Sequence, residues 1–574
     1  MTRLTIDLET HKPEGFVAKK KKDERPDFRI DEVDRFGWLA DGADTAYWSE
    51  DACPMPMDIR EYRYHNGVYD HGILHRLDPI NFPLHNIDIE DTMALAYSLG
   101  EEDLSLKGLM QKHLGVNTVT YTQQELIGTD QYHAQDLWGT RNLHPKLMER
   151  QRGRAYDIDR ALIPALIDMS FRGYVIDHER LDAGIAQAEQ TRDRCQAQFD
   201  KLMFGEEVLK SRRKKVTKAR GLEYVEKFGP PDIGSPKQLQ QFFMRESADE
   251  ETLKEIEHHD ANDQAGQAAM WIRKYRKSNT LLTRYFYPNQ EKDTLTGLFN
   301  LTPQDNEQTG GMDGGTEGGR LSSERDNMQN QPPEMQRILR APEGFTILHP
   351  DYSQIELRFA AEVSQDPYLL EVFKPGSTRD LHMETRDFFR PFLPGWCNCG
   401  PVKCIHRDQA KRFNFGVLYF GGPMYLASVM GVSYAVAEML LNVLREQWAV
   451  FFAWAERHWL EVQRHGKSML PEPICQIRNV PLVGNIEHSK KLAINHPIQG
   501  SAGYLMKHAQ TRLSEDGFLL ANQIHDASPL FVQDDIDLEL PKARIREIME
   551  GTAREYLPTV GGPVEIKDSV YWRD

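Results

Sequence analysis

The stretch Leu348-His349-Pro350-Asp351-Tyr352-Ser353-Gln354-Ile355-Glu356-Leu357-Arg358 joins two kinds of local pattern. The apolar residues 345–348 before it include a β-branched side chain and predict a strand. Residues 355–363 combine good helix formers with helical spacing and predict a helix. Asp351 therefore lies at a strand-to-helix junction, where a rigidly held carboxylate can bind a hard metal ion. A solvated aspartate in a turn is the alternative.

A second stretch, residues 407–419, carries four side chains at steps of four: Arg407, Lys411, Phe415 and Tyr419. On a helix each such step turns by roughly 40°, so the four form one slowly turning stripe. The two cations suit a triphosphate, and the two aromatic rings can pack on sugar and base. An amphipathic helix with an ordinary charged edge has the same spacing.

A third stretch, residues 517–532, has two short apolar runs on either side of His525-Asp526. This pattern predicts a hairpin with the carboxylate of Asp526 at its turn. Asp351 and Asp526, brought together from distant parts of the chain, can hold two divalent ions about 4 Å apart. Such a pair of ions stabilises the attacking and leaving oxygens of an in-line phosphoryl displacement.

Together and in this order, the three stretches resemble motifs A, B and C of the family A DNA polymerases. This group contains the large fragment of bacterial DNA polymerase I and many phage replicases. The resemblance covers nearly the whole chain and implies an α/β multidomain protein. We expect an RNase H-like α/β exonuclease domain, followed by a right-hand polymerase domain with palm, fingers and thumb.

The resemblance also implies roles for individual side chains of the polymerase site. Asp351 and Asp526 would bind two Mg²⁺ ions, or Mn²⁺ in their place, with help from the Tyr352 carbonyl. Lys411 would also protonate the pyrophosphate leaving group, and Glu356 would exclude a ribose 2′-OH. The residues implied in nucleotide binding are Arg407, Lys411, Phe415, Tyr419, His382, Glu356 and Gln354. Those implied in contacts with primer–template DNA are Arg320, Gln329, Asn330, Asn495, Gln499 and His525.

A separate group of carboxylates begins at the N-terminus. The predicted strand 4–9 places Asp7 and Glu9 on one face. Asp70 and a Tyr132-x3-Asp136 pattern follow. In order and spacing these residues resemble the DEDD-type 3′–5′ proofreading exonucleases that use a tyrosine. The resemblance implies that Asp7, Glu9, Asp70 and Asp136 bind two metal ions and that Tyr132 orients the attacking water.

The sequence departs from the family pattern at two positions. Ala527 stands where the family usually has a second motif C carboxylate, and Phe420 replaces the glycine that commonly follows the motif B tyrosine. Both essential aspartates remain, so we expect polymerase activity. Two alternatives stay open: an exonuclease whose polymerase half only binds DNA, and a catalytically silent scaffold. Phe rather than Tyr at position 415 predicts discrimination against dideoxynucleotides.

The expected order of domains follows from the motif positions. We expect an exonuclease domain at 1–150, an entry segment at 151–177, a thumb at 178–300, palm with motif A at 301–375, fingers at 376–490 and the remaining palm at 491–574. Six cations within residues 212–220 suit the phosphates of a duplex, or form a solvated basic loop. They are Arg212, Arg213, Lys214, Lys215, Lys218 and Arg220.

A cysteine–histidine cluster directly precedes Arg407 and is not a usual feature of the family. Its members are Cys397, Cys399, Cys404 and His406. Thiol and imidazole donors suit a structural Zn²⁺, although the first gap is tighter than usual. Loose reduced thiols are the alternative.

Composition bounds the class of protein. The 574 residues are 40% hydrophobic and 27% charged, without an apolar run that could span a bilayer or an N-terminal signal peptide. We therefore expect a cytoplasmic protein, in the host cell if phage-encoded. The net charge of −17 argues against DNA binding over the whole surface, but a local basic groove suffices. Expected partners are primer–template DNA, dNTPs, and replisome proteins or a processivity factor.

Overall fold

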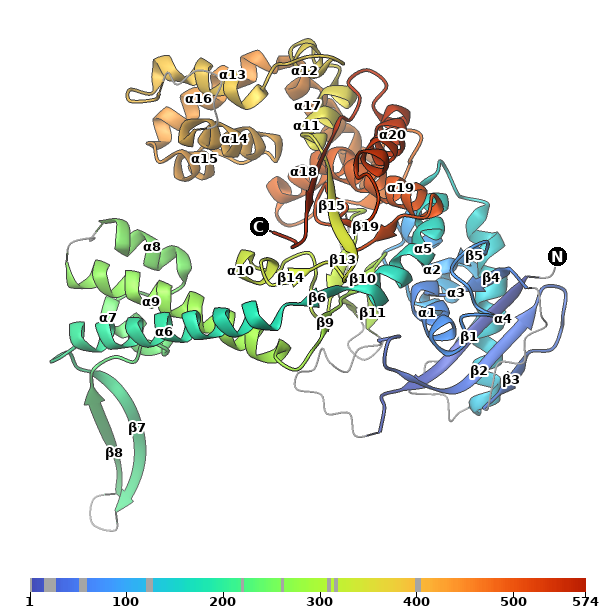
Figure 1. Cartoon of the computed structure of the whole chain (residues 1–574), viewed down its shortest axis with the longest axis horizontal. Helices are drawn as coiled ribbons and strands as arrows, with labels where there is room; N and C mark the ends of the chain where they lie inside the picture. Colours follow the sequence, from blue (N-terminus) through green and yellow to red (C-terminus); the bar gives the residue numbers. More distant parts are fainter. Residues whose placement is uncertain are drawn as a thin grey trace. The chain divides into compact units, whose positions relative to one another are not determined.

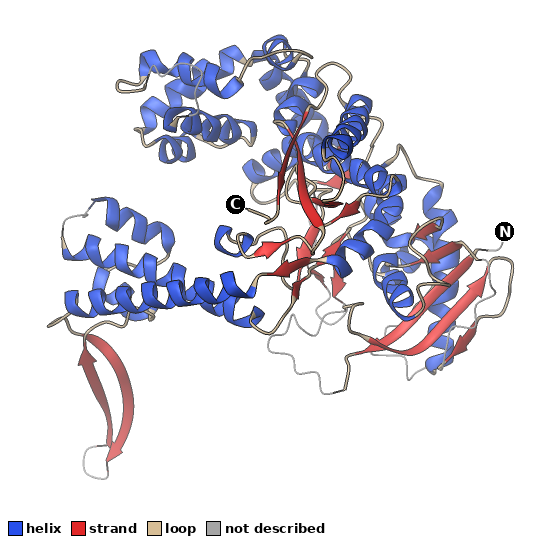
Figure 2. Ribbon diagram, in the orientation of Figure 1, coloured by secondary structure: helices blue, strands red, loops and turns tan. Residues whose placement is uncertain are grey.

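The structure, a computed structural model, describes residues 3–14, 27–50, 59–119, 127–217, 221–259, 263–306, 311–313, 318–397 and 404–573. Contacts divide the chain into two compact units. The first comprises Met1–Gly173, Thr296–Asn330 and Glu343–Ser569, and the second comprises Tyr174–Leu295, Gln331–Pro342 and Val570–Asp574. The predicted mixed α/β class is confirmed (Figure 2).

A five-stranded sheet at the N-terminus has the order β3-β2-β1-β4-β5. Its strands are β1 (Leu4–His11), β2 (Glu32–Ala40), β3 (Tyr47–Ser49), β4 (Glu61–Tyr64) and β5 (Asp88–Asp91). Strand β1 pairs antiparallel with β2 and parallel with β4. Helix α4 (Thr129–Met148) packs on β1 and β2 (Figure 1). The nearby helices are α1 (Gly67–Leu77), α2 (Thr92–Ser98) and α3 (Leu106–Leu114).

Helix α5 (Ala155–Arg172) contacts the N-terminal sheet and helices on one side and the C-terminal part of the same unit on the other. Its buried Asp159 accepts hydrogen bonds from Lys507 Nζ (2.7 Å) and Tyr504 OH (2.8 Å). A buried charge needs such partners to offset its desolvation. Asp159 therefore ties α5 to helix α19 (Ser501–Glu515).

A four-stranded antiparallel sheet of order β18-β19-β15-β20 carries the motif A and motif C stretches. Its strands are β18 (Leu519–Leu520), β19 (Leu530–Gln533), β15 (Phe345–Tyr352) and β20 (Val564–Ser569). In register, Leu348 lies opposite Leu530 on β19, and Asp351 lies opposite Glu565 on β20. Helix α11 (Ile355–Ser364) follows β15, as the sequence predicts, and α20 (Glu539–Tyr556) packs on β20 and β15.

The part of the sequence between motif A and motif C forms a group of helices (Figure 1). They are α12 (Pro367–Phe373), α13 (Leu381–Phe389), α14 (Ile405–Leu418), α15 (Pro423–Met430), α16 (Tyr434–Gln447), α17 (Ala449–His465) and α18 (Ile486–Asn495). The π-helix η6 (His496–Gly500) links α18 to α19. Phe389 of α13 and Phe413 of α14 meet edge to face, with ring centroids 4.9 Å apart, so these two helices share a core.

The second unit is built on the long helix α6 (His178–Leu202), which packs on α9 (Gln264–Thr280); α9 packs in turn on α8 (Glu250–His259). A hairpin of β7 (Val208–Thr217) and β8 (Gly221–Gly229) follows α6 (Figure 2). Residues 212–215 of the basic run belong to strand β7 and not to a loop, which was the alternative to a phosphate-binding patch; residues 218–220 lie outside the described ones. Helix α7 (Pro236–Phe243) starts with Pro in its first turn.

Short strands complete both units. In the first they are β10 (Leu298–Asn300) with β13 (Ser322–Glu324), β11 (Gln304–Asn306) with β12 (Gly311–Asp313), and β16 (Lys467–Met469) with β17 (Ile477–Asn479). In the second, β6 (Tyr174–Ile176) lies between β14 (Leu339–Arg340) and β9 (Thr294–Leu295). Within the described ranges no single helix is long and apolar enough to cross a bilayer; α15 and α16 satisfy that test only as a pair, with a bend of 107°.

Candidate active sites

The predicted hairpin of motif C presents Asp526 at its tip. Ile524 and Ala527 exchange two backbone hydrogen bonds of 2.9 Å, so His525 and Asp526 form a two-residue turn. His525 adopts a φ of +52°, which such a turn requires. The backbone N–H of Tyr352 donates to the Asp526 carbonyl oxygen (3.1 Å). Asp351 and Asp526, 175 positions apart in the sequence, therefore come from directly neighbouring backbone segments.

The charges around the two aspartates favour a bound cation. Burial, with the charges of Glu356 and Asp351, raises the pKa of Asp526 to about 7, although Arg320 opposes the shift. Burial and the charge of Glu565 raise the pKa of Asp351. Carboxylates that raise one another's pKa become stable as anions when a metal ion lies between them. The donor set thus suits Mg²⁺.

Glu565 was not predicted from the sequence. It lies directly opposite Asp351 across β15 and β20, and side chains at opposite positions of an antiparallel pair project from the same face of the sheet. Ala527, where the family usually has a carboxylate, pairs with Asp351 through an isolated bridge. The carboxylate that is missing at position 527 on one side of Asp351 is therefore matched by Glu565 on the other side.

Helix α14 carries the predicted stripe. Arg407 in its first turn is held by Asp380, with Nε and Nη2 at 3.0 and 2.6 Å from Oδ2. Lys411 is exposed one turn later, and its charge lowers the pKa of Asp351, which places it near the acidic pair. Phe415 and Tyr419 follow with ring centroids 6.1 Å apart, and Tyr419 ends the helix. The stripe is confirmed as a structural feature.

His382 of α13 lies beside this stripe, with its ring 5.9 Å from that of Phe415. The side chain is only 1% exposed, and Asn414 Nδ2 lies 3.1 Å from its Nδ1. Burial lowers the pKa of His382 to about 4, so the imidazole is neutral at pH 7. Among the described residues, Nε2 has no hydrogen-bond partner. His382 can therefore offer a triphosphate a hydrogen bond but not a positive charge.

Glu356, in the first turn of α11, is 4% exposed and lies between two predicted site residues. One carboxylate oxygen accepts a hydrogen bond from Tyr419 OH and the other forms an ion pair with Arg320. Gln499 of η6 also hydrogen-bonds Tyr419. The network fixes the Glu356 carboxylate at the base of α14, where it can exclude a substituent of the sugar.

The remaining predicted contact residues surround the same hairpin and helix. Gln354, with φ +53°, caps α11, and Asn495 precedes η6. Gln329 donates to the Leu321 carbonyl (3.3 Å), and Asn330 is exposed. Asn522 Nδ2 donates to the Met328 carbonyl (2.8 Å), so the loop before Asp526 is joined to the loop that carries Gln329 and Asn330.

Phe420 explains why a glycine is common at its position. Its φ of +56° lies in the left-handed region that favours glycine. The ring packs against Phe451 and Phe452, with centroids 6.1 and 5.9 Å away. Aromatic contacts of this kind can offset part of the backbone strain.

The four carboxylates of the predicted exonuclease site also come together. Asp7 and Glu9 lie on β1, Asp70 in the first turn of α1, and Asp136 on α4. Burial raises the pKa of Asp7 well above its usual value, and Asp136, Glu9 and Asp70 raise it further. Asp7 Oδ2 is buried without a hydrogen-bond partner among the described residues. An orphaned carboxylate oxygen among like charges suits a divalent ion.

Two residues of this second site were missed in the sequence. Lys107 of α3 forms an ion pair with Asp136 and donates to Tyr132 OH (2.9 Å). His133 Nδ1 lies 3.4 Å from Glu9 Oε1. His133 adjoins Tyr132 in the sequence and could have been noticed, whereas no sequence signal connects α3 with α4. Asn66 begins α1 with φ +98°, which gives it a structural role.

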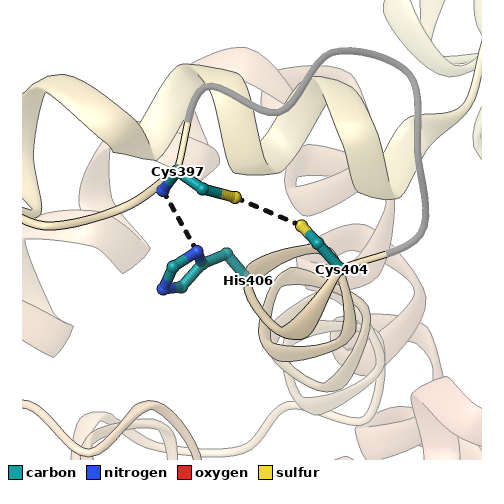
Figure 3. A group of neighbouring side chains, drawn as sticks. All are labelled: Cys397, Cys404 and His406. Carbon is teal, nitrogen blue, oxygen red and sulfur yellow. Dashed lines mark hydrogen bonds between the residues drawn. The ribbon is translucent and has the colours of Figure 1, made fainter.

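Three members of the cysteine–histidine cluster lie together, and Cys399 lies outside the described residues (Figure 3). Cys397 Sγ and Cys404 Sγ are 3.4 Å apart. The backbone N–H of Cys397 donates to His406 Nδ1 (3.1 Å). The donor atoms of the three residues all lie within 4.8 Å of one another.

The chain resembles known proteins in sequence and in fold. It is 28% identical over 486 residues to "DNA polymerase I, thermostable" of Thermus filiformis, covering 80% of this chain and 52% of that protein. It is 32% identical over 246 residues to DNA polymerase I of Streptococcus pneumoniae, covering 41% of this chain and 27% of that protein. The chain thus spans about half the length of the Thermus relative.

Among solved structures, the POL domain of Pol1 from M. smegmatis, a complex with DNA primer-template and dNTP, superposes with a TM-score of 0.72. The match covers 94% of this chain and 93% of that chain at 17% identity, and it shows the fold. The sequence model of DNA polymerase family A matches residues 205–570, more than half of the chain. This chain belongs to DNA polymerase family A.

Proposed function

We propose that this protein is a template-directed DNA polymerase that adds dNTPs to a primer 3′ end. The observation that carries the proposal is the meeting of Asp351 and Asp526 at the end of the central sheet, near Lys411 on α14. Bound divalent ions, Mg²⁺ or in its place Mn²⁺, would activate the primer 3′-OH and stabilise charge on the reacting phosphate. Asp351 and Asp526 would hold these ions, with the Tyr352 carbonyl as a further ligand.

The residues of α14 and its neighbours then bind the nucleotide. Arg407 and Lys411 neutralise the triphosphate, and Lys411 gives a proton to the departing pyrophosphate. Neutral His382 donates a hydrogen bond from Nε2. Phe415 stacks on the nucleotide, and Tyr419 packs beside the templating base. Glu356, fixed by Tyr419 and Arg320, excludes a 2′-OH, and Gln354 lines the same pocket.

The DNA contacts follow from the loops around the acidic pair. Arg320, Gln329 and Asn330 would reach the minor groove, whose acceptors are nearly degenerate, so the geometry of a base pair is tested without its sequence being read. Asn495, Gln499 and His525 would contact the template and the primer end. We assign 178–300 to the thumb, 301–375 and 491–574 to the palm, and 376–490 to the fingers.

We further propose a 3′–5′ proofreading exonuclease at 1–150, with 151–177 as the link to the polymerase. Asp7, Glu9, Asp70 and Asp136 would hold two divalent ions, and Tyr132 would orient the attacking water. The convergence of the four carboxylates on β1, α1 and α4 supports this assignment. Lys107 would hold Tyr132 and Asp136 in place.

The setting in the cell is also a proposal. A polymerase joined to a compact proofreading half suits a phage replisome in the host cytoplasm, with a separate processivity factor.

For Cys397, Cys404 and His406 we propose a structural Zn²⁺, because thiol and imidazole donors favour that ion.

Primer extension with a 5′-labelled primer, with and without dNTPs, tests both activities. We expect extension with dNTPs and shortening without them. Asp526→Asn should lower extension at least 10³-fold and leave shortening intact. Asp7→Ala should abolish shortening and leave extension intact. Loss of both activities in either variant would contradict two separate sites.

One alternative rests on Ala527: an exonuclease whose polymerase half only binds DNA. It predicts that the wild-type protein shortens the primer at every dNTP and Mg²⁺ concentration and that Asp526→Asn changes nothing. Extension by the wild-type protein excludes this alternative.

A further inference from the structure

The cysteine–histidine cluster lies at the start of α14, the helix that carries Arg407 and Lys411. Cys404 is the N-cap of this helix, and its Sγ accepts a hydrogen bond from the backbone N–H of Arg407 (3.4 Å). Cys397 belongs to the segment after α13 and reaches Cys404 across an interval of seven residues. The cluster therefore joins the first turn of α14 to the chain that leaves α13.

The geometry suits a shared metal ion better than a covalent bond between the sulfurs. Two thiolates on one tetrahedral zinc lie about 3.8 Å apart, given Zn–S bonds of about 2.3 Å. The observed separation of 3.4 Å is close to that value and well beyond the roughly 2 Å of a disulfide. His406 Nδ1 accepts the Cys397 N–H with its one lone pair, and a metal ion bound at Nδ1 would take the place of that hydrogen bond.

The surroundings place positive charge beside Cys404 and fix the imidazole of His406. Arg386, only 1% exposed, directs Nη1 at Cys404 Sγ (3.7 Å), and the N-terminus of α14 adds partial positive charge. The ring of Trp396 stacks on that of His406, with centroids 5.2 Å apart. Thiol and imidazole are the ligand types of structural zinc sites, and the described residues supply three of the four ligands that such sites usually have.

We infer that Zn²⁺ bound by Cys397, Cys404 and His406 clamps the first turn of α14 and so sets the affinity for the incoming nucleotide. The ion would join the N-cap of α14 to the segment after α13, one turn before Arg407. Arg407, in the first turn of α14, also pairs with Asp380, the N-cap of α13. The effect on nucleotide affinity rests on the proposed nucleotide-binding role of α14.

The metal content tests the site itself. The full chain, produced with added zinc and washed with excess Mg²⁺, should contain about one zinc per chain by elemental analysis. Cys397→Ser, Cys404→Ser and His406→Asn should lose it, whereas Cys195→Ser, at a buried cysteine in α6, should retain it. Co²⁺ added to the zinc-free chain should give a thiolate-to-cobalt charge-transfer band. Zinc-free wild type without such a band, or full zinc in the three variants, would overturn the site.

Hydrogen exchange tests the clamp independently of catalysis. Backbone amides of residues 405–411 should exchange at least tenfold more slowly in the zinc-loaded than in the zinc-free chain, while those of α19 exchange equally. The KM for dNTP should rise about fivefold on zinc removal, with kcat within twofold. Equal exchange, or an unchanged KM in an active enzyme, would overturn the clamp. Absence of primer extension in the zinc-loaded wild type would instead contradict the proposed polymerase function, and the exchange result would still decide the clamp.

Discussion

The backbone N–H of Tyr352 donates a 3.1 Å hydrogen bond to the carbonyl oxygen of Asp526. A second bond, from the N–H of Ser528 to the Pro350 carbonyl (3.0 Å), lies on the other side of the turn. The two bonds fix the register of the motif C hairpin against β15. The spacing of the Asp351 and Asp526 side chains is therefore set by the sheet and not by flexible side chains.

The raised pKa of Asp526 predicts a pH-dependent stability of the metal-free protein. The folded-state pKa of about 7 exceeds the usual value of about 3.9, so this carboxyl stabilises the fold when protonated. Its contribution is present below about pH 4 and is lost as pH rises through 7. In EDTA, Asp526→Asn should therefore raise the melting temperature more at pH 8 than at pH 5. Asp535→Asn, an exposed neighbour, is the control; an equal change at both pH values would contradict the prediction.

Glu565 predicts a changed metal requirement. Its carboxylate lies opposite Asp351 and adds a negative charge to the site, where Ala527 lacks one. Glu565→Gln should raise the Mg²⁺ concentration for half-maximal extension several-fold, because about 1 kcal/mol of attraction for the ion is lost. Adding Ala527→Glu to this variant should lower the requirement again. A Mg²⁺ titration of primer extension measures both effects, and no change in either variant would remove Glu565 from the site.

Glu356 predicts the choice of sugar. Because Tyr419 and Arg320 fix its carboxylate, Glu356→Ala should open space beside the 2′ position and raise the relative kcat/KM for rNTP over dNTP at least tenfold. Glu362→Ala, which alters a carboxylate on the outer part of the same helix, should leave that ratio unchanged. Single-nucleotide insertion kinetics give the comparison. Equal ratios in the two variants would show that another group excludes ribonucleotides.

Phe415 predicts the response to dideoxynucleotides. The half-buried ring lies between His382 and Tyr419 on the stripe of α14 and has no hydroxyl group. Phe415→Tyr should increase ddNTP incorporation relative to dNTP, because the added hydroxyl can replace a contact that the missing 3′-OH would make. Chain-termination ratios on a defined template measure the change. A variant that incorporates ddNTPs no better than the wild type removes this prediction.

Phe420 predicts a trade between backbone strain and packing. Phe420→Gly relieves a left-handed φ, which costs about 1 kcal/mol, but it removes the contacts of a half-buried ring with Phe451 and Phe452. We expect the lost packing to outweigh the relieved strain. The variant should melt at a lower temperature than the wild type. Phe420→Asn, which tolerates the same φ, should also melt lower, so a melting temperature above the wild-type value in either variant would contradict the packing argument.

Local patterns predicted the elements of the polymerase half better than their neighbours in space. Strand β15, helix α11 and the stripe on α14 follow from side chains close together in the sequence. Glu565 escaped because its place opposite Asp351 depends on the register of β20, which tertiary packing sets. Lys107 was not predicted either, because α3 contacts α4 only in the folded chain. The hairpin at residues 208–229 was not predicted, because the basic run was interpreted by its charge alone and not by its strand pattern.

Helix α5 limits how the proposed exonuclease site can be removed from the chain. Its Asp159 is buried against Lys507 and Tyr504 of α19, while its other face covers α1, α2 and β5. Deletion of residues 1–172 would remove Asp159 and leave the buried ammonium group of Lys507 without its partner. Deletion of residues 1–150 would expose the apolar side of α5 to solvent. A version without the proposed exonuclease activity is therefore better made by changing single carboxylates in the full-length chain.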